Sequence, residues 1–373
     1  MEKIKSYLHN EWVKAVVVLI AWNVGLRFIA IVGYVMLPEK FAPLDFISHI
    51  WQSNFIFWSF ANFDGEHYLS IAKFGYQIRS GFPQFAFFPL LPLLINALSH
   101  LIGDLYLSGM IVSQLSLLIA IYFIAQWCNT LKVKNIGIPL LVSTGAIFLA
   151  SVYTEPVFIM LSAMAMYYSE QRWWGRAIIA TAFATATRVN GIFLALFLFV
   201  KMIKNGESLQ LVVSKTLLSL SGLMSYMIFL HFQVGDFLAW FHAQGAWGKA
   251  KATSPIITFI SYLKAVSVDF VPDFTHLVVI FEVLVTIGAI YLFIKLLLHN
   301  QLDLAYWLYL AGNLAMPITT GSLGSMPRFT LILFPLLVVL PKLSKLGRTL
   351  YYICSITICT VGIIFFTRGY WYG

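Results

Sequence analysis

Two carboxylates and a histidine lie within four positions of one another in FDGEHYLSIAKFGY, residues 63–76. These residues, Asp64, Glu66 and His67, interrupt a chain that is otherwise strongly apolar. The stretch predicts a helix with Asp64 as its N-cap. A carboxylate at this place can also take a proton from an alcohol, so Asp64 is the candidate catalytic base, with Glu66 and His67 as candidate substrate-binding residues. A loop acid that only caps a helix is the simpler alternative.

Four other polar segments interrupt the apolar runs and supply further candidate substrate-binding residues. They are SVYTEP with Tyr153 and Glu155, ATRVNG with Arg188, GDFLAWFHAQGAWGK with Gln244 and Trp247, and GSMPRF with Arg328. An arginine within a membrane is costly unless it lines a wet cavity or meets an anion, and phosphate matches its planar fork. The alternatives are a structural ion pair between Arg188 and Glu155, and an Arg328 side chain that reaches the membrane interface.

The segment that holds Gln244 and Trp247 is a candidate site for an acceptor. It also carries His242 and Lys249, and Lys251 follows it. Glutamine side chains donate hydrogen bonds to sugars and tryptophan rings stack on them, although tryptophans are also ordinary residues of a membrane interface. A second carboxylate facing Asp64 would permit a divalent metal, but no ligand spacing demands one, so the metal is left open.

The elements that position these residues are membrane helices. The 373 residues are 60% hydrophobic and only 10% charged, and apolar runs recur from end to end, which predicts an all-α, polytopic membrane bundle forming a single domain over residues 1–373. The net charge of +9 is better explained by cytoplasmic loops than by a nucleic-acid partner. The three cysteines, Cys128, Cys354 and Cys359, show no grouping typical of a zinc site or of a disulfide framework.

About eleven crossings can be drawn from the apolar runs. They cover residues 12–36, 107–128, 136–152, 156–169, 174–187, 192–202, 209–231, 276–298, 304–318, 328–340 and 350–366. With the N-terminus inside, the internal connections carry most of the lysines and arginines, as the positive-inside rule requires. The runs on either side of Arg188 are short, so ATRVNG is predicted to be the tip of a hairpin that stays below the outer surface.

One further apolar run, residues 85–103, is left out of the count because it would place the basic loops outside. It is predicted to be an interfacial or re-entrant helix within a long first external loop, residues 37–106. A second external loop covers residues 232–275. With this threading all the polar segments above converge on the outer side, where they predict a single site.

The ordered motifs resemble the PIG-V family of mannosyltransferases. FDGEHYLSIAKFGY followed by FAFFPLLPLL, then SVYTEPVF, ATRVNGIF, GDFLAWFHAQGAWGK and SMPRFTLILFP, match its signature segments from residue 63 to residue 335. The chain departs from the family at Phe63, where tryptophan is usual, and in being shorter than the eukaryotic enzymes that build glycosylphosphatidylinositol anchors. The first departure leaves the acid intact, and the second leaves the acceptor open.

The resemblance implies a GT-C glycosyltransferase fold and a polyprenyl-phosphate sugar donor. Asp64 would remove the proton of an acceptor hydroxyl in an inverting displacement, while Arg188 and Arg328 neutralise the leaving lipid phosphate. The implied acceptor is a lipid, a glycolipid or another extracytoplasmic molecule. The expected location is a multi-pass cell-membrane protein with its site on the extracytoplasmic face, and the endoplasmic reticulum membrane is the alternative.

A transporter or flippase for a lipid-linked saccharide is the main alternative from another class. Such a protein is expected to place ionisable groups along a path that connects both faces, often in two related halves. Here the polar segments gather on one side and no repeat is visible in the sequence. This pattern favours the transferase.

Overall fold

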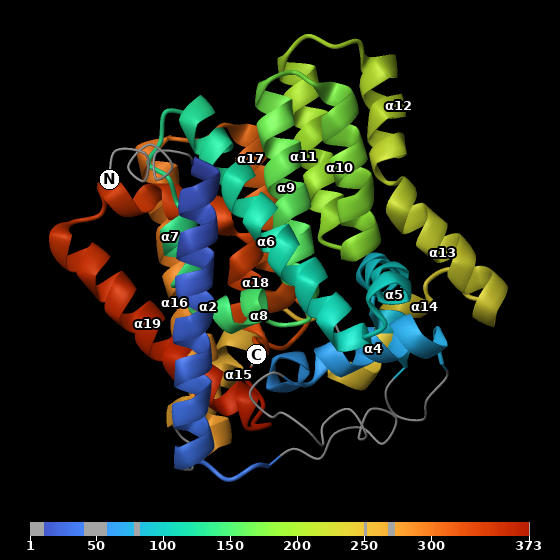
Figure 1. Ribbon diagram of the computed structural model, residues 1–373. Helices are drawn as coiled ribbons and strands as arrows, with labels where there is room; N and C mark the ends of the chain where they lie inside the picture. The colour runs from blue at the N-terminus through green and yellow to red at the C-terminus, as the bar shows by residue number, and fades with distance from the viewer. Residues whose placement is uncertain (1–10, 41–57, 78–82, 250–251, 268–272, 373) are drawn as a thin grey trace, which may run out of the picture.

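The computed structural model describes residues 11–40, 58–77, 83–249, 252–267 and 273–372, and its described part is helical with no strand (Figure 1). The all-α prediction is therefore confirmed for these residues. Lys251 and parts of the predicted first external loop, residues 41–57 and 78–82, lie outside the described residues.

Among the described residues, four helices are long and apolar enough to cross a membrane: α2 (Glu11–Met36), α6 (Leu105–Thr130), α16 (Phe274–His299) and α19 (Lys345–Thr367). Each exceeds the roughly 20 residues that a bilayer core requires. α2 packs against both α6 and α19, and α16 packs against the segment that precedes α19. These four helices correspond to four of the predicted crossings.

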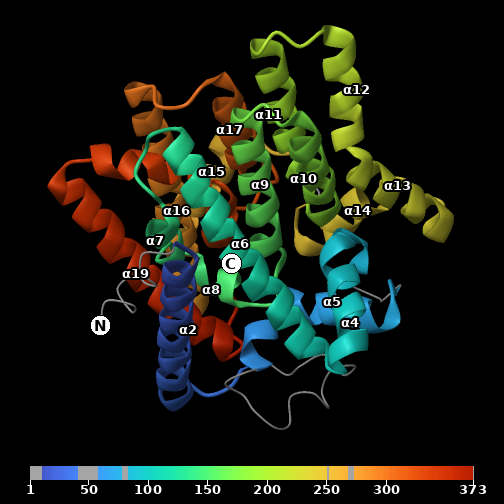
Figure 2. The same ribbon diagram turned by 45° about the horizontal axis from the view of Figure 1, so that its top comes forward.

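A fifth crossing is formed if α12 (Leu209–Ser219) and α13 (Ser221–Val234) are taken as one bent span, with an angle of 49° between them. The bend is visible in Figure 2, where α13 leans away from the line of α12. A Cβ atom at Gly222 would lie 2.1 Å from the Ala182 carbonyl oxygen. Glycine therefore allows the start of α13 to pack directly on the backbone of α10 (Trp174–Thr187).

The centre of the bundle consists of shorter helices. α9 (Thr154–Glu170), α10, α11 (Gly191–Lys204) and α17 (Leu304–Ile318) have 14 to 17 residues, fewer than a straight crossing needs. α9 packs between α6 and α10, and α11 packs on α17. The count of about eleven crossings is thus not confirmed and stays a prediction.

Two further predicted crossings are not continuous α-helices. Residues 136–152 contain two five-residue helices, α7 (Gly137–Leu141) and α8 (Ala146–Ala150), which are separated by residues 142–145. Residues 328–340 divide into α18 (Met326–Ile332) and a 3₁₀ helix, η5 (Phe334–Lys342). Pro335 contributes to this second break because it has no N–H to donate within a helix. Hydropathy alone did not register these interruptions.

Short helices gather at one end of the bundle, the lower end in Figure 1. They are η2 (Ser59–Ala61), α4 (Asp64–Phe74), η3 (Gln84–Ala86), α5 (Leu90–Ile102), α14 (Ala239–His242), η4 (Ala243–Trp247) and α15 (Pro255–Ser267). α5 has 13 residues, too few to cross, which agrees with leaving residues 85–103 out of the count. Its place at the membrane interface stays a prediction, as do the external positions of both loops. α15 is an apolar helix within residues 232–275 that the sequence did not predict.

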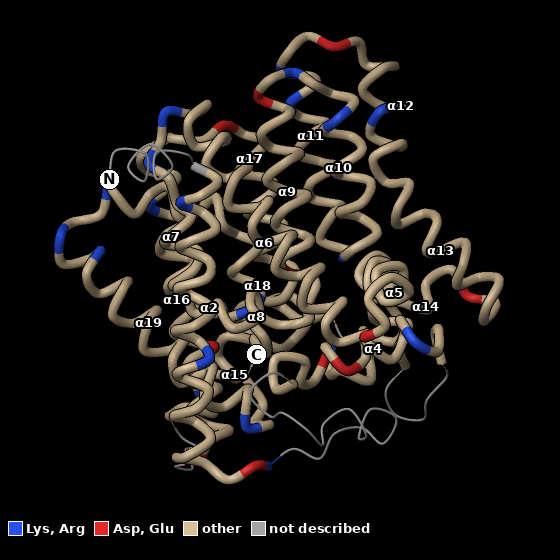
Figure 3. The backbone as a smooth tube through the Cα atoms, viewed as in Figure 1, with Lys and Arg blue, Asp and Glu red and all other residues tan. Residues whose placement is uncertain are grey.

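Charged residues gather at both ends of the central helices. Figure 3 shows them around α4 and again at the upper ends of α9 to α12. At the upper end Lys201 pairs with Glu170 and lies 2.9 Å from Asp303. The Tyr306 hydroxyl donates to Glu170 over 2.7 Å and accepts a hydrogen bond from the Trp127 indole. We call this group of Glu170, Lys201, Asp303 and Tyr306 the upper network.

Candidate active site

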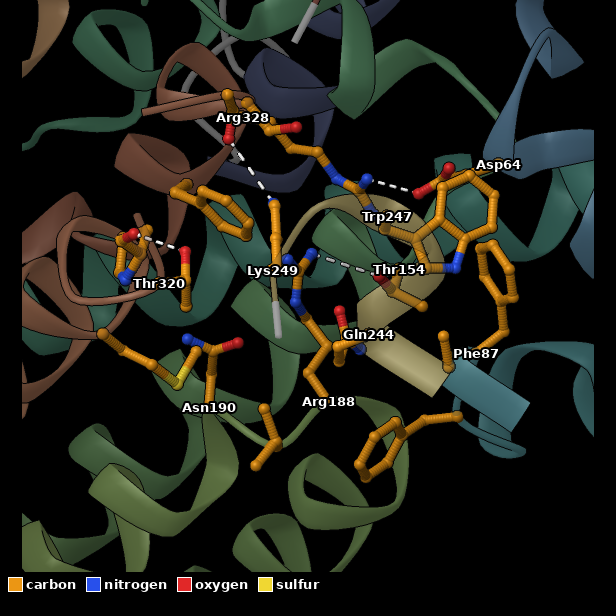
Figure 4. Close-up of a pocket in the computed structure, with 18 of the residues that line it drawn as sticks. Asp64, Phe87, Thr154, Arg188, Asn190, Gln244, Trp247, Lys249, Thr320 and Arg328 are labelled. Carbon is orange, nitrogen blue, oxygen red and sulfur yellow. Dashed lines mark hydrogen bonds and ion pairs between the residues drawn. The ribbon is translucent and has the colours of Figure 1, made fainter. Parts of the chain in front are cut away.

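Several helices begin around one cavity of about 510 Å³ at the lower end of the bundle. Asp64 is the first residue of α4, Thr154 is the first residue of α9, and Asn190 immediately precedes α11; all three line the cavity. Arg188 lies in the turn between α10 and α11, as the predicted hairpin tip requires. Figure 4 shows these residues facing a common space. The polar segments that the sequence assigned to one site do converge.

Asp64 is held by its backbone and by an arginine. The residue before it, Phe63, has φ of 61°, a backbone conformation that non-glycine residues rarely adopt. The prediction that Asp64 is the N-cap is wrong: Phe63 occupies that position and Asp64 begins the helix, with no capping bond from its side chain. Asp64 is 9% exposed, and its carboxylate pairs with Arg328.

Arg328 also joins a second carboxylate, so that four charges form one chain. Glu155 is fully buried and its Oε1 accepts from both Arg188 and Arg328. Arg188 further donates to the Thr154 hydroxyl over 3.2 Å. We call Asp64, Glu155, Arg188 and Arg328 the lower network. Its two carboxylates balance its two guanidinium groups, which is what burial of charge in an apolar bundle requires.

The structural ion pair that was the alternative role for Arg188 is therefore present. Pairing with Glu155 does not remove Arg188 from the cavity, because its guanidinium group still lines the wall. Glu155 Oε2 is buried and has no hydrogen-bond partner among the described residues. Arg188 thus contacts Glu155 on one side and lines the open cavity on the other.

The backbone around Arg328 is fixed by two close contacts. Ser325, which precedes α18, has φ of 74°, and its N–H donates to Glu282 Oε1 over 3.1 Å. On the other side, a Cβ atom at Gly145 would lie 2.1 Å from the Pro327 carbonyl oxygen. These contacts place the Pro327–Arg328 step against α8, from which Arg328 reaches both carboxylates.

Five of the predicted site residues line the cavity and four do not. Asp64, Arg188, Gln244, Trp247 and Arg328 line it. Glu66, His67, Tyr153 and Glu155 are buried outside its lining. The Tyr153 ring lies 4.8 Å from the Arg328 guanidinium carbon, and its hydroxyl donates to the Asn62 carbonyl oxygen over 3.0 Å. Tyr153 and Glu155 therefore support Arg328 from behind.

His67 touches the cavity wall through aromatic rings. Its ring stacks on Phe87 with centroids 4.7 Å apart and meets Trp247 edge-on at 5.5 Å. Both partners line the cavity. His242, from the candidate acceptor segment, does not: it is exposed and its Nδ1 lies 2.7 Å from an Asp236 carboxylate oxygen.

Several lining residues have donors and acceptors that suit a sugar. Tyr68, Asn190 and Thr320 lie on the wall with Gln244. Burial raises the pKa of Tyr68 to about 12, so its phenol stays protonated. The phenol oxygen lies 3.5 Å from the Thr154 hydroxyl oxygen. Within the described ranges no three His, Cys, Asp or Glu side chains gather as a metal site.

Known proteins of similar sequence indicate the family of the chain that carries Asp64 and the two arginines. A sequence profile of the Mannosyltransferase (PIG-V) family matches residues 34–251, more than half of the chain. The chain belongs to this family. Human GPI alpha-1,6-mannosyltransferase 2 is 27% identical over 172 residues, which are 42% of this chain and 34% of the human protein. The chain thus aligns with about a third of that relative's length. No solved structure matches it.

The PIG-V match covers most of the site but not all of it. It includes Asp64, Glu155 and Arg188, and it ends at residue 251, before Arg328. The assignment of Arg328 to the same site depends on its pairs with Asp64 and Glu155. In this PIG-V chain the C-terminal third therefore completes a cavity that the N-terminal part begins.

Sequence reasoning gave no separate role to Lys249, which lines the cavity, and did not consider Glu282 at all. The signal for Lys249 was its position two residues after Trp247. The signal for Glu282 was an acid within the apolar run of α16, a placement that is costly and often functional.

Proposed function

We propose that this PIG-V chain is a membrane mannosyltransferase that moves mannose from a polyprenyl phosphate to a hydroxyl group of a lipid-linked or other extracytoplasmic acceptor. The observation that carries the proposal is one cavity with a carboxylate, Asp64, and two guanidinium groups, Arg188 and Arg328, on its wall. A carboxylate can accept a hydroxyl proton, and guanidinium groups stabilise a departing phosphate.

The proposed reaction is a single displacement. The acceptor oxygen attacks the anomeric carbon as its proton passes to Asp64, and the bond from that carbon to the phosphate oxygen breaks. The electron pair leaves with the polyprenyl phosphate, whose charge Arg188 and Arg328 neutralise. Arg328 is paired with Asp64 in the structure, so the incoming phosphate would compete with Asp64 for Arg328 and leave the carboxylate ready to take the proton.

The apolar walls fit a substrate with a hydrocarbon tail. Phe87, Phe88, Phe241 and Met316 line the cavity beside the polar groups. A polyprenyl chain can lie among such residues and continue into the bilayer, and the mannosyl phosphate then needs to travel only to the lower network. Gln244 and Trp247 are the proposed contacts to sugar hydroxyls and to a sugar face.

The test uses purified protein in lipid with polyprenyl-phosphate mannose and candidate acceptors. Transfer of mannose with inverted anomeric configuration is the expected result. A product that retains the donor configuration would overturn the single displacement. Movement of the lipid-linked sugar across a liposome membrane without any transfer would instead identify a transporter.

We further propose that the cavity opens on the extracytoplasmic face of a cell membrane, with the endoplasmic reticulum membrane as the alternative. The basic connections at the other end support this orientation through the positive-inside rule. An impermeant amine label applied to intact cells should not react with Lys132 or Lys342. Reaction at either residue would reverse the orientation.

A further inference from the structure

Lys249 differs from the other cavity cations because it has no carboxylate partner among the described residues. It follows η4 after Gly248, whose φ is 70°. Its Nζ lies 3.5 Å from the Gly324 carbonyl oxygen and 4.5 Å from the centroid of the Phe329 ring. In the described part of the chain no carboxylate oxygen lies within 4.0 Å of this nitrogen. Its present contacts are thus a long hydrogen bond and an aromatic face.

The two arginines differ from Lys249 in this respect. Arg188 pairs with Glu155, and Arg328 pairs with both Glu155 and Asp64. The Arg188 guanidinium carbon lies 5.7 Å from the same Phe329 ring that Lys249 covers. Three cations therefore occupy one wall, and the two carboxylates of the lower network are already bound by the arginines. Among the described residues, no carboxylate competes with an entering anion for Lys249, whose hydrogen bond to the Gly324 carbonyl oxygen is drawn in Figure 4.

The local field disfavours a proton on this lysine in the absence of an anion. Burial, followed by repulsion from Arg328 and Arg188, lowers the pKa of Lys249 to about 8, although Asp64 and Glu282 act in the opposite direction. A bound anion would raise the pKa of Lys249 again, since an opposite charge at close range favours the charged form of a lysine. Anion binding and protonation of Lys249 are therefore linked.

We propose that Lys249 binds the lipid-linked phosphate of the sugar donor and stays in contact with it as polyprenyl phosphate leaves. The proposal rests on the proposed function for the identity of the lipid. Arg188 and Arg328 then act as charges that are shared with Glu155 and Asp64, whereas Lys249 gives its charge to the phosphate alone.

The experiment measures binding of polyprenyl monophosphate to the full-length protein in detergent, with the corresponding polyprenol and inorganic phosphate as comparison probes. A hydrogen bond to a charged group predicts that Lys249→Gln weakens polyprenyl monophosphate binding about 10- to 100-fold, with polyprenol binding unchanged. Lys204→Gln, at the opposite end of the bundle, is the matched control and should bind as wild type does. Inorganic phosphate should bind more weakly than the lipid phosphate, and equal competition by both would overturn the lipid-linked assignment.

The pH dependence separates a charge effect from a packing effect. Above pH 7.5 a phosphate monoester is almost fully ionised, because its second pKa is about 6. Wild-type affinity should then fall as pH rises through about 8, since the lysine is cationic below its pKa and neutral above it. Lys249→Arg keeps the same facing groups, Arg188, Arg328, Asp64 and Glu282, but stays charged. Its affinity should stay level to pH 9.5, and a decline equal to that of wild type would overturn the proposal.

Failure of this inference can be told apart from failure of the proposed function. If wild type transfers mannose but Lys249→Gln binds polyprenyl monophosphate as tightly as wild type, the role of Lys249 is wrong and the transferase stands. If wild type transfers no mannose but phosphate binding depends on Lys249, the transferase is wrong and the anion site stands. Should Lys249→Gln fail to fold, the alkaline profile of Lys249→Arg decides the matter.

Discussion

Each end of the bundle holds an ion network around buried cations, and the two networks are arranged in opposite ways. In the upper network two carboxylates, Glu170 and Asp303, share the ammonium group of Lys201. In the lower network two guanidinium groups, Arg188 and Arg328, share one oxygen of Glu155. In the upper network the Tyr306 hydroxyl donates to Glu170 and accepts a hydrogen bond from Trp127. The lower one has Asp64, Arg188 and Arg328 on the wall of a cavity.

Buried charge alone does not identify a binding or catalytic site. Both networks pair their charges, as an apolar interior requires. In the lower network Asp64, Arg188 and Arg328 line one cavity together with a further cation, Lys249, and Glu155 keeps one buried oxygen without a described partner. The open hollow at the upper end is lined by Asp303 and Lys204, but not by Glu170, Lys201 or Tyr306. Equivalent substitutions at the two ends of the bundle should therefore have different effects on mannose transfer and on stability.

Removing the carboxylate charge of Asp64 should have the largest effect. Asp64→Asn keeps the size of the side chain but cannot accept the acceptor proton, and loss of a general base lowers rates by about 10²- to 10⁴-fold. The measurement is mannose transfer in lipid. The control is Asp303→Asn in the upper network, where the amide oxygen can still accept from the Ala305 N–H that caps α17. Near wild-type transfer by Asp64→Asn would remove Asp64 from the chemistry.

Removing the charge of Glu155 should have the next largest effect, on stability as well as activity. Glu155→Gln leaves Arg188 and Arg328 with one carboxylate between them, and breaking a buried pair on one side costs about 3–5 kcal/mol. Unfolding in mixed detergent measures the change in free energy. Glu207→Gln is the matched change at the upper end, where a partly exposed pair with Lys215 should contribute less than about 1 kcal/mol. Equal losses of unfolding free energy for Glu155→Gln and Glu207→Gln would contradict the stronger pairing of the buried glutamate.

Filling the space at Gly145 should have a moderate effect that reaches the site through the backbone. Gly145→Ala places a Cβ atom 2.1 Å from the Pro327 carbonyl oxygen, and overpacking of this kind costs about 1–3 kcal/mol. Mannose transfer should fall together with stability because Arg328 directly follows Pro327 in the chain. At Gly175, in the first turn of α10, an added Cβ meets no atom within 4 Å. Gly175→Ala should therefore match wild type in both measurements, and equal behaviour of the two variants would count against a fixed Arg328 backbone.

Trimming Lys204 should have the smallest effect. Its ammonium lies 4.0 Å from Asp303 and its side chain is 46% exposed, so Lys204→Ala should change the free energy of unfolding by less than about 0.5 kcal/mol. Transfer should be unchanged. A large loss would mean that the upper network is more than a structural ion cluster.

The residue composition of the site could be predicted from the sequence because polar groups are rare in this chain. Each short polar segment among apolar runs had few places to go, and five of the nine predicted site residues line one cavity. The hairpin with Arg188 at its tip was predictable because the two flanking runs are too short to cross. The distinction between Asp64, which faces the cavity, and Glu66, which is buried outside its lining, required the structure.

The remaining errors have physical causes. Hydropathy cannot tell one apolar helix from two short ones, so the break at residues 142–145 and the 3₁₀ helix that begins at Phe334 were missed. A tertiary contact sets the position of the Asp64 side chain. Its carboxylate pairs with an arginine 264 positions away instead of capping its own helix. The role of Lys249 depends on its having no carboxylate partner in the described part of the chain, and a sequence motif cannot show this.

The convergence of helix starts has a consequence for any anion in the cavity. The peptide dipoles of α4, α9 and α11 place the positive ends of three helices at the wall where Asp64, Thr154 and Asn190 lie. This part of the potential comes from the backbone, so it neither titrates nor disappears when a side chain is replaced. A variant without Lys249 should thus retain a residual preference for phosphate over an uncharged lipid, at a level that pH does not change.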